Sequence, residues 1–317
     1  MTGASGECCD VRGELVSVVL PVFNDDMVLE RALQSVFAQT EPAGEVIVVD
    51  DASDIPAAMA IRGICEAFPK VRLVVNSRNL GAAAARNIGV EAATNPFVAF
   101  LDADDEWLPE KLAVQTGEMR ATGQAISACA FQLYREGNGS GQGEFRRPKP
   151  IRSLSDLVWG CSISPGSGLL LHKSVFETVG GFDPAYRRFE DWDWLIRAAR
   201  HGYAVHIVGT VLVNVFFRRT PPVENVKASA DRIRDTYSKL FLSLGFLSWL
   251  KFNSTYHVEI AAACIRNGRF FGAVGATSVA VILWPFRNLA FWRRLVRVST
   301  RILIARIRDI TNSLLSR

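Results

Sequence analysis

Short apolar runs alternate with longer segments of helical periodicity over the first hundred residues of the chain. The run at 16–22 is rich in β-branched residues, which predicts a short, buried strand of a parallel sheet. Asn24 and Asp25 are expected to cap the helix that follows. Together the runs predict strands at 16–22, 45–49, 71–75 and 97–101, and helices at 28–37, 55–68 and 82–93. This alternation is typical of a doubly wound α/β fold, in which helices flank a mostly parallel sheet.

The pattern is less regular after Asp105. The segment 135–150 is rich in glycine and basic residues and has no periodicity, so we interpret it as a loop. Pro221 and Pro222 form the best boundary between domains, and the chain beyond them is predicted to be helical. The further predicted elements are helices at 109–121 and 191–201, strands at 125–134, 164–172 and 204–217, and C-terminal helices broken at Gly245, Gly268 and Pro285.

The composition places the chain among globular proteins. It has 317 residues, of which 49% are apolar and 21% charged, enough to bury a large core. The six cysteines form no Cys-x-x-Cys pair, so neither a zinc site nor a disulfide framework is predicted. The N-terminus lacks the basic and then apolar run of a secretory signal. We therefore expect a cytoplasmic protein with a disordered leader at 1–14.

The charge is unevenly distributed along the chain. The net charge is +4, yet residues 286–317 alone contain eight arginines, no lysine and one aspartate. The body of the protein is therefore weakly acidic. A nucleic-acid-binding protein would carry its positive charge over its working face, so nucleic acid is not an expected partner.

The C-terminal segment 286–315 has apolar residues mostly at helical spacing, with arginines between them. A basic amphipathic helix of this kind suits an anionic membrane surface, which would place the protein peripherally at the inner face of the membrane. It also suits a helix that packs on the domain with its arginines solvated, and both interpretations stay open. The 17 uncharged residues at 270–286 include two glycines and a proline, and they are predicted to form a buried helix rather than a transmembrane one.

Polar clusters follow three of the four predicted parallel strands. Ligands of open α/β sheets bind beyond the carboxyl ends of the strands. Asparagine and aspartate also cap helices and form turns, but converging carboxylates repel one another and favour a divalent cation. Asp102 and Asp104 stand two residues apart in an extended segment, so both can face one Mg²⁺ or Mn²⁺ ion and leave positions open for phosphate oxygens. The clusters lie at 21–25, 50–53 and 102–105.

The segment 81–89 combines two glycines and four consecutive alanines with Arg86 and Asn87. Small residues allow the start of a helix to approach a ligand closely, and Arg86 and Asn87 can donate hydrogen bonds to a diphosphate or a ribose. Small residues also allow tight packing of a helix on a sheet. Both interpretations are carried forward.

In this combination the chain resembles the family 2 glycosyltransferases, which bind nucleotide sugars with a GT-A fold. The resemblance covers about 15–217, and the segments follow one another in the order and spacing of the family. The matching segments are VVLPVFN at 18–24, VVDDAS at 48–53, NLG at 79–81, ARNIG at 85–89, FLDADD at 100–105, GGFD at 180–183 and EDWD at 190–193.

The resemblance implies roles on the donor side of the site. Pro21 and Phe23 would shape the pocket for the base, and Asp51 would accept a hydrogen bond from the imide N–H of a uracil. Asp104 would bind Mn²⁺ or Mg²⁺ directly, and Asp102 would share the ion or lie nearer the ribose. The family sometimes adds a metal-binding histidine after the last strand, and 217–220 contains none, so the third protein ligand is not identified.

The resemblance also implies an acceptor side and a reaction. Asp191 would be the catalytic base of an inverting transfer, with Glu190, Asp183 and Trp192 on the acceptor side. The Gln-x-x-Arg-Trp motif of processive members is missing, which favours transfer of a single sugar. The expected acceptor is a hydroxyl of a glycan or a lipid-linked acceptor in surface polysaccharide assembly, and the expected donor is a UDP-sugar. The implied domains are a GT-A domain at 15–220 and a helical region at 221–317, ending in the basic amphipathic tail at 286–315.

Two alternatives differ in chemistry. A non-catalytic module of the same fold would bind nucleotide sugar or glycan without turnover, but Asp51, Asp102, Asp104 and Asp191 are all present. A nucleotidyltransferase would need a Gly-rich loop with a basic residue directly after the first strand. That position holds Phe-Asn-Asp-Asp at 23–26 instead.

Overall fold

The protein is described here by a computed structural model, which covers residues 15–135, 143–163, 165–218 and 220–286. The chain forms two compact units. The first contains residues up to 157 together with 161–185 and 190–218, and the second contains 158–160, 186–189 and the chain from 219 onward. The predicted leader 1–14 and nearly all of the tail 286–315 lie outside the described residues.

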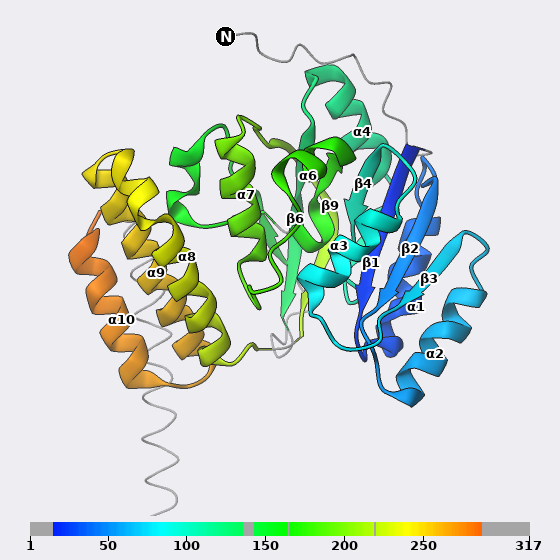
Figure 1. The fold of residues 1–317 in the computed structure, drawn as a ribbon, viewed down its shortest axis with the longest axis horizontal. Coiled ribbons are helices and arrows are strands. Elements are labelled where there is room, and N and C mark those ends of the chain that lie inside the picture. The colour runs from blue at the N-terminus through cyan, green and yellow to red at the C-terminus, as the bar shows by residue number, and fades with distance from the viewer. Residues whose placement is uncertain (1–14, 136–142, 164, 219, 287–317) are drawn as a thin grey trace, which may run out of the picture. The chain divides into compact units, whose positions relative to one another are not determined.

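One sheet organises the first unit (Figure 1). β1 pairs in parallel with both β2 and β4, β2 pairs in parallel with β3, and β6 pairs in parallel with β9. β8 runs antiparallel between β4 and β6. The order is β3-β2-β1-β4-β8-β6-β9-β5, with β7 on β6. The strands are β1 (Val16–Val22), β2 (Glu45–Asp50), β3 (Val71–Val75), β4 (Phe97–Phe100), β5 (Glu106–Trp107), β6 (Ile126–Arg135), β7 (Glu144–Arg146), β8 (Leu170–His172) and β9 (His206–Phe217).

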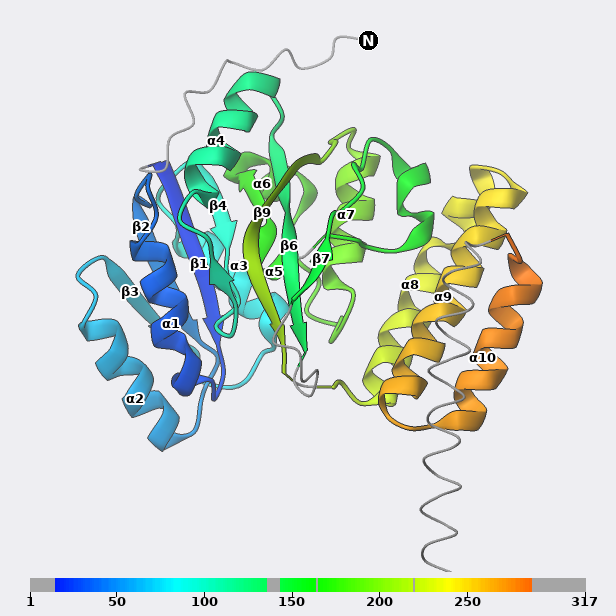
Figure 2. The same cartoon turned by 180° about the vertical axis from the view of Figure 1, so that it is seen from behind.

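Helices lie on both faces of this sheet, which confirms the predicted α/β class. α3 crosses in front of β1 in Figure 1, and α1 covers the opposite face in Figure 2. A Cβ atom added to Gly89 of α3 would lie 2.2 Å from Cγ1 of Val19. At Gly89, the small residues of 81–89 therefore serve tight packing of helix on sheet. The helices of this unit are α1 (Asp26–Phe37), α2 (Ile55–Glu66), α3 (Ala82–Ala92), α4 (Lys111–Thr122), α5 (Pro165–Gly168), α6 (Lys173–Val179) and α7 (Glu190–Arg200). A 3₁₀ turn at Leu154–Trp159 begins in this unit and ends in the second.

Two local expectations are wrong. The first part of the predicted strand 164–172 is the short helix α5, and only Leu170–His172 pairs as a strand. The bend at α5 brings the hydroxyl of Ser167 to the carboxylate of Asp105. Asp25 occupies the N-cap position of α1 but makes no capping hydrogen bond with its side chain. Asn24 uses its side chain to accept from the backbone N–H of Asp54 instead, at 2.9 Å.

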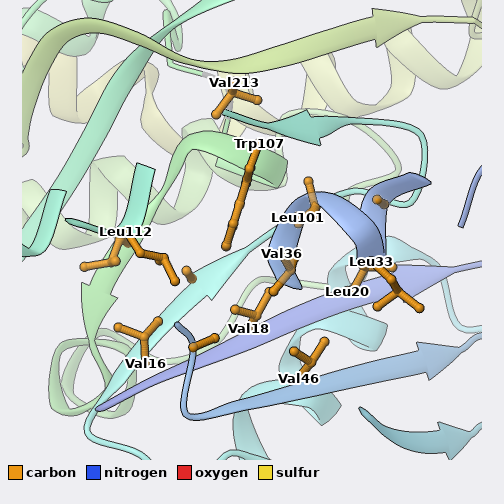
Figure 3. Packing of buried hydrophobic residues seen from close by; sticks show 14 of the residues in the cluster. Val16, Val18, Leu20, Leu33, Val36, Val46, Leu101, Trp107, Leu112 and Val213 are labelled. Atoms are coloured by element: carbon orange, nitrogen blue, oxygen red, sulfur yellow. The ribbon is translucent and has the colours of Figure 1, made fainter. Parts of the chain in front are cut away.

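The core between the sheet and α1 is built from alternate residues of the central strands. Val16, Val18 and Leu20 of β1 are fully buried and belong to one cluster with Leu33 and Val36 of α1. Figure 3 shows these side chains together with Trp107 and Leu112, which extend the cluster toward β9. Because β1 is buried on both faces, its apolar run is nearly continuous in the sequence.

A lysine is buried inside this unit. The side chain of Lys111 has no solvent exposure, and its Nζ lies 3.9 Å from the centre of the Trp107 ring. Within the described part of the chain, Nζ has no hydrogen-bond partner. Burial lowers the pKa of Lys111 to about 8, and the neighbouring Cys129 only partly opposes this. An ammonium group without a hydrogen bond is costly in such a place.

We expect Lys111→Met to stabilise the protein. The unfolded chain holds the lysine proton up to pH 10.5 and the folded chain up to about pH 8, so wild-type stability should rise with pH between these values. Below pH 8 the variant avoids the full cost of burying a protonated lysine. Its free energy of unfolding should therefore exceed that of the wild type by roughly 3 kcal/mol. Urea unfolding of both proteins from pH 7 to 10 measures the difference, with the exposed Lys70→Met as control. A gain for Lys111→Met that does not shrink as the pH rises would contradict this explanation.

The second unit is a bundle of α8 (Val223–Ser243), α9 (Phe246–Arg266) and α10 (Phe270–Leu283). The helices break at Gly245 and Gly268, both with positive φ, as the sequence predicts. Phe241 of α8 stacks on Phe252 of α9 with ring centres 4.3 Å apart. None of the helices in the described ranges is long and apolar enough to cross a membrane.

The expectation that 270–286 forms a buried helix is wrong. The segment does form α10, but only Ala273 and Ala280 of this helix are buried. Phe271 is 86% exposed and Ile282 is 78% exposed. The lack of charge in a segment predicts that something apolar covers it, but it does not predict what that is.

Candidate functional site

The loops that follow β1 and β2 are joined by polar side chains. The backbone N–H of Asn24 donates to the hydroxyl of Ser53 at 2.9 Å, and Asn24 accepts from Asp54 in return. Asn24 has a φ of 52°, a conformation that asparagine tolerates better than most residues. Next to this junction Phe23 is 39% exposed, whereas Pro21 is buried within β1. The base-pocket roles of both residues stay predictions.

Asp51 anchors the start of α3. It is buried, and its carboxylate accepts hydrogen bonds from the Asn76 side chain at 2.8 Å and from the backbone N–H groups of Leu80 and Gly81, the latter at 2.7 Å. These donors occupy most of the acceptor capacity of a carboxylate. Asp51 therefore fixes the loop before α3, and its hydrogen bond to a uracil stays a prediction.

The loop after β4 carries three carboxylates with different surroundings. Asp105 is buried and accepts from the Ser167 hydroxyl and, at 2.9 Å, from the backbone N–H of Phe216. Burial, and after it the charge of Asp102, raises the pKa of Asp105 well above its usual range. The Asp102 carboxylate lies so close to Gly166 that an added Cβ there would be 2.0 Å from Oδ2. Asp105 thus supports the loop from inside, and Asp102 is held against α5.

Asp104 is a carboxylate whose negative charge is poorly compensated. Burial, together with the nearby charges of Asp102 and Asp25, raises the pKa of Asp104 to about 6, against the opposing effects of a backbone hydrogen bond and of Arg218. Arg218 also pairs with Asp25 at 3.3 Å. A cation at this point would relieve the repulsion.

Arg86 connects this loop to the start of α7. Its guanidinium donates from Nη2 to Asp102 at 2.5 Å and from Nη1 to Glu190 at 3.1 Å. The residue is only 6% exposed, and its Nε has no partner among the described residues. Burial alone would lower the pKa of Arg86, but the two carboxylates hold it above its usual value. The structure therefore brings together three predicted site residues, Arg86, Asp102 and Glu190, from three segments distant in sequence.

We expect Arg86→Met to lower the free energy of unfolding by about 3–5 kcal/mol, because it leaves two partly buried carboxylates without their partner. Adding Glu190→Gln to Arg86→Met should recover part of this loss. Urea unfolding of the two variants and of the exposed control Arg62→Met measures the effect. The explanation fails if Arg86→Met costs no more than Arg62→Met.

Asp191 lies in the first turn of α7, where a carboxylate is favoured by the helix dipole. Its Oδ1 accepts from the backbone N–H of Trp192 at 2.8 Å. The thiol of Cys161 lies beside it, and burial together with the charge of Asp191 raises the pKa of Cys161 well above its usual range. Asp191 is half-buried, so it remains partly accessible for the base role that stays a prediction.

An ion pair behind Asp191 fixes the Gly180-Gly181 turn. Asp193 accepts from Nε of Arg197 at 2.9 Å. The same guanidinium donates to the carbonyl oxygens of Val179, Gly180 and Gly181. Both predicted acceptor-side segments, 180–183 and 190–193, are thus held together by one arginine.

Three predicted residues have internal partners. Asn87 exchanges two hydrogen bonds with the backbone of Phe182, at 2.8 and 2.9 Å, so its amide holds the acceptor-side loop. Asp183 accepts from the backbone N–H of Ala185 at 2.9 Å. The indole of Trp192 is 1% exposed and donates to the carbonyl of Leu157, so it supports the site from behind. Their contacts with substrate stay predictions.

Sequence reasoning missed Ser167, Arg31 and Arg218. Arg31 donates to the backbone carbonyl of Asp104 at 2.5 Å and lies 4.1 Å from the centre of the Phe216 ring. It lines an open pocket of about 240 Å³ with Arg135, Arg218, Val28, Tyr134, Phe216 and Phe217. No local pattern marks Arg31 or Ser167, because their partners are 73 and 62 residues away. Arg218 directly follows β9, where the sequence offers no histidine.

The profile of a known family, described as "Glycosyl transferase family 2", matches residues 17–180. The chain belongs to this family. The amylovoran biosynthesis glycosyltransferase AmsB of Erwinia amylovora is 30% identical over 207 residues, which are 62% of this chain and 68% of that protein. The UDP-Glc:alpha-D-GlcNAc-diphosphoundecaprenol beta-1,3-glucosyltransferase WfgD of Escherichia coli is 30% identical over 149 residues, 47% of this chain and 57% of that protein. The matching part of this family 2 chain thus spans little more than half of WfgD.

Solved structures show the same fold. The S. aureus TarS 1-349 structure in complex with UDP-GlcNAc superposes with a TM-score of 0.55 at 14% identity, over 84% of this chain and 90% of that one. The same S. aureus TarS segment without that ligand has a TM-score of 0.54 and covers 86% of this chain. At this low identity the likeness establishes the fold alone, which is the GT-A fold expected from the motifs.

Proposed function

We propose that this family 2 glycosyltransferase moves one sugar from a UDP-sugar to a hydroxyl of a glycan or lipid-linked acceptor, with inversion at the anomeric carbon. The observation that carries the proposal is the Arg86 bridge. It joins the Asp-x-Asp loop, which is the expected donor side, to Glu190 beside the expected base Asp191. A donor and an acceptor bound to these two segments would meet at this bridge.

A divalent cation fits the residues of the donor side. The described part of the chain contains no group of three or more histidine, cysteine or acidic side chains arranged to hold a metal ion. Asp102 and Asp104 are nevertheless a pair of oxygen donors whose charges disfavour one another, as the raised pKa of Asp104 indicates. We propose that they would hold Mn²⁺ or Mg²⁺, with donor phosphate oxygens as further ligands. The bound ion would neutralise the diphosphate that leaves.

The protein's own residues do the rest of the chemistry in this proposal. Asp191 takes the proton from the acceptor hydroxyl while the hydroxyl oxygen attacks the anomeric carbon. The nucleoside diphosphate departs from the opposite side of the sugar. Arg86 keeps Asp102 and Glu190 in place. Asn87 and Arg197 hold the turn at 180–182 on which the acceptor would rest.

The acceptor class and the location of the enzyme are proposed from the names of two relatives and from the basic tail. The name of WfgD specifies a GlcNAc-diphosphoundecaprenol acceptor, and the name of AmsB specifies amylovoran biosynthesis. We propose a related role in surface polysaccharide assembly at the cytoplasmic face of the membrane. The tail 286–315 would bind anionic lipid there through its arginines, at ~1 kcal/mol for each residue near the surface.

A screen of donors tests this function. Released nucleotide should appear with at least one UDP-sugar and Mn²⁺ or Mg²⁺, and more slowly with the corresponding GDP- or dTDP-sugars. The reason is that Asp51 is expected to accept from the uracil imide. A coupled assay detects the free nucleoside diphosphate, with heat-inactivated protein as the blank. Preferential binding of a purine nucleotide over UDP would contradict the role given to Asp51.

A further inference from the structure

The outer face of α10 is an apolar stripe that the rest of the described chain leaves open. We define this α10 outer face by its exposed residues. At 3.6 residues per turn they fall within an arc of about 160° on one side of the helix. Ala273 and Ala280 lie opposite, and the carbonyl of Ala280 accepts from the Ser254 hydroxyl of α9 at 2.9 Å. The exposed members are Phe271, Val274, Val279, Val281 and Ile282, with Phe286 just beyond the helix.

A second apolar group lies near the end of this stripe. Nζ of Lys251, in α9, is 4.9 Å from the centre of the Trp284 ring, so the first turns of α9 lie beside the last turn of α10. Leu244, Phe246 and Leu247 are exposed at the connection between α8 and α9. Exposed apolar residues that gather on one side of a domain mark an interaction site.

The charges around this surface select its partner. Residues 236–258 and 270–286 contain no aspartate or glutamate, and their only lysines are Lys239 and Lys251. A second copy of the protein would bring the same basic surroundings against each other, since a twofold interface pairs a patch with itself. An anionic lipid surface is attracted to them.

We propose that the α10 outer face lies in the interface of an anionic phospholipid bilayer, with the helix axis parallel to the membrane plane. A helix of 14 residues is about 21 Å long, shorter than the ~30 Å hydrocarbon core. Its apolar arc would enter the acyl boundary, and Trp284 would lie at the level of the headgroups, where tryptophan is enriched. This contact is apolar, which distinguishes it from the electrostatic contact proposed for the arginines of the tail.

Vesicle flotation of the full-length protein tests the proposal. Wild-type protein should float with vesicles of phosphatidylcholine and phosphatidylglycerol, and much less with phosphatidylcholine alone. The double variant Phe271→Gln/Ile282→Gln should lower the partition coefficient at least about tenfold, because two large apolar side chains no longer leave water. The control is Ile55→Gln/Met59→Gln on α2, whose side chains are 77% and 71% exposed and which should bind as wild type. Circular dichroism melting confirms that each variant is folded and does not depend on the proposed activity.

Three outcomes would overturn the assignment. The first is unchanged vesicle binding by Phe271→Gln/Ile282→Gln together with loss of binding in the tail variant Arg293→Gln/Arg294→Gln/Arg297→Gln. This result would show that the tail, and not α10, contacts the membrane. A wild-type dimer in light scattering that the α10 variant converts to monomer would identify a second copy as the occupant. Absence of wild-type binding to anionic vesicles would remove the membrane altogether.

Discussion

Asp104→Ala is expected to abolish sugar transfer. Asp102 would then be the only carboxylate of the Asp-x-Asp pair, and it is already engaged by Arg86 at 2.5 Å. A single engaged carboxylate cannot hold a divalent ion against the charge of a diphosphate. Coupled nucleotide-release assays measure the loss, and the wild type in EDTA should show the same loss, reversed by excess Mn²⁺ or Mg²⁺.

The control for Asp104→Ala is Asp235→Ala, which removes a side chain that is 69% exposed on α8. It should turn over as wild type. The midpoint temperature of thermal unfolding of Asp104→Ala should be no lower than that of the wild type, because the substitution removes a buried carboxylate that its neighbours repel. Full activity of the wild type in EDTA would contradict the proposed metal dependence. Full activity of Asp104→Ala would contradict the assignment of Asp104 as a metal ligand.

Asp191→Asn is expected to lower turnover by at least ~10²-fold, the lower range for the loss of a general base. The amide can still accept the backbone hydrogen bond from Trp192, so fold and donor binding should be retained. Donor affinity by calorimetry and turnover by nucleotide release separate the two effects. Glu190→Gln is the comparison, because Glu190 is the next candidate.

Near-normal turnover of Asp191→Asn would assign the base elsewhere. Loss of turnover in Glu190→Gln alone would then point to Glu190. The structure predicts a different phenotype for Glu190→Gln, since it removes a partner of the buried Arg86 and should affect stability as well as activity. The pair of variants therefore separates a chemical role from a structural one.

The central strands β1, β2 and β4 could be predicted from sequence because they are buried on both faces. A continuous apolar run such as that of β1 indicates a strand buried on both faces. The segments of helical periodicity between such runs give the order of the elements. The segment containing α5 was not predictable in this way. Its conformation depends on the contact of Ser167 with Asp105, 62 residues earlier in the chain.

Only those site residues could be predicted that are of a suitable type and directly follow a predicted strand. The sequence placed Asp102 and Asp104 at one edge, but it did not reveal that Arg86 joins Asp102 to Glu190, which lies 104 residues after the arginine. Nor did it reveal that the amide of Asn87 pairs with the backbone of Phe182. The contact of Asn87 with a ligand stays a prediction. The exposure of α10 was missed because hydrophobicity predicts burial without naming the partner.

The most direct test of the central claim is the anomeric configuration of the transferred sugar. We propose a single displacement in which Asp191 activates the acceptor hydroxyl opposite the departing diphosphate. Proton NMR of the purified product, formed from an α-linked UDP-sugar, should therefore show a β linkage. A product that retains the α configuration would contradict the proposed mechanism and the role of Asp191 in it.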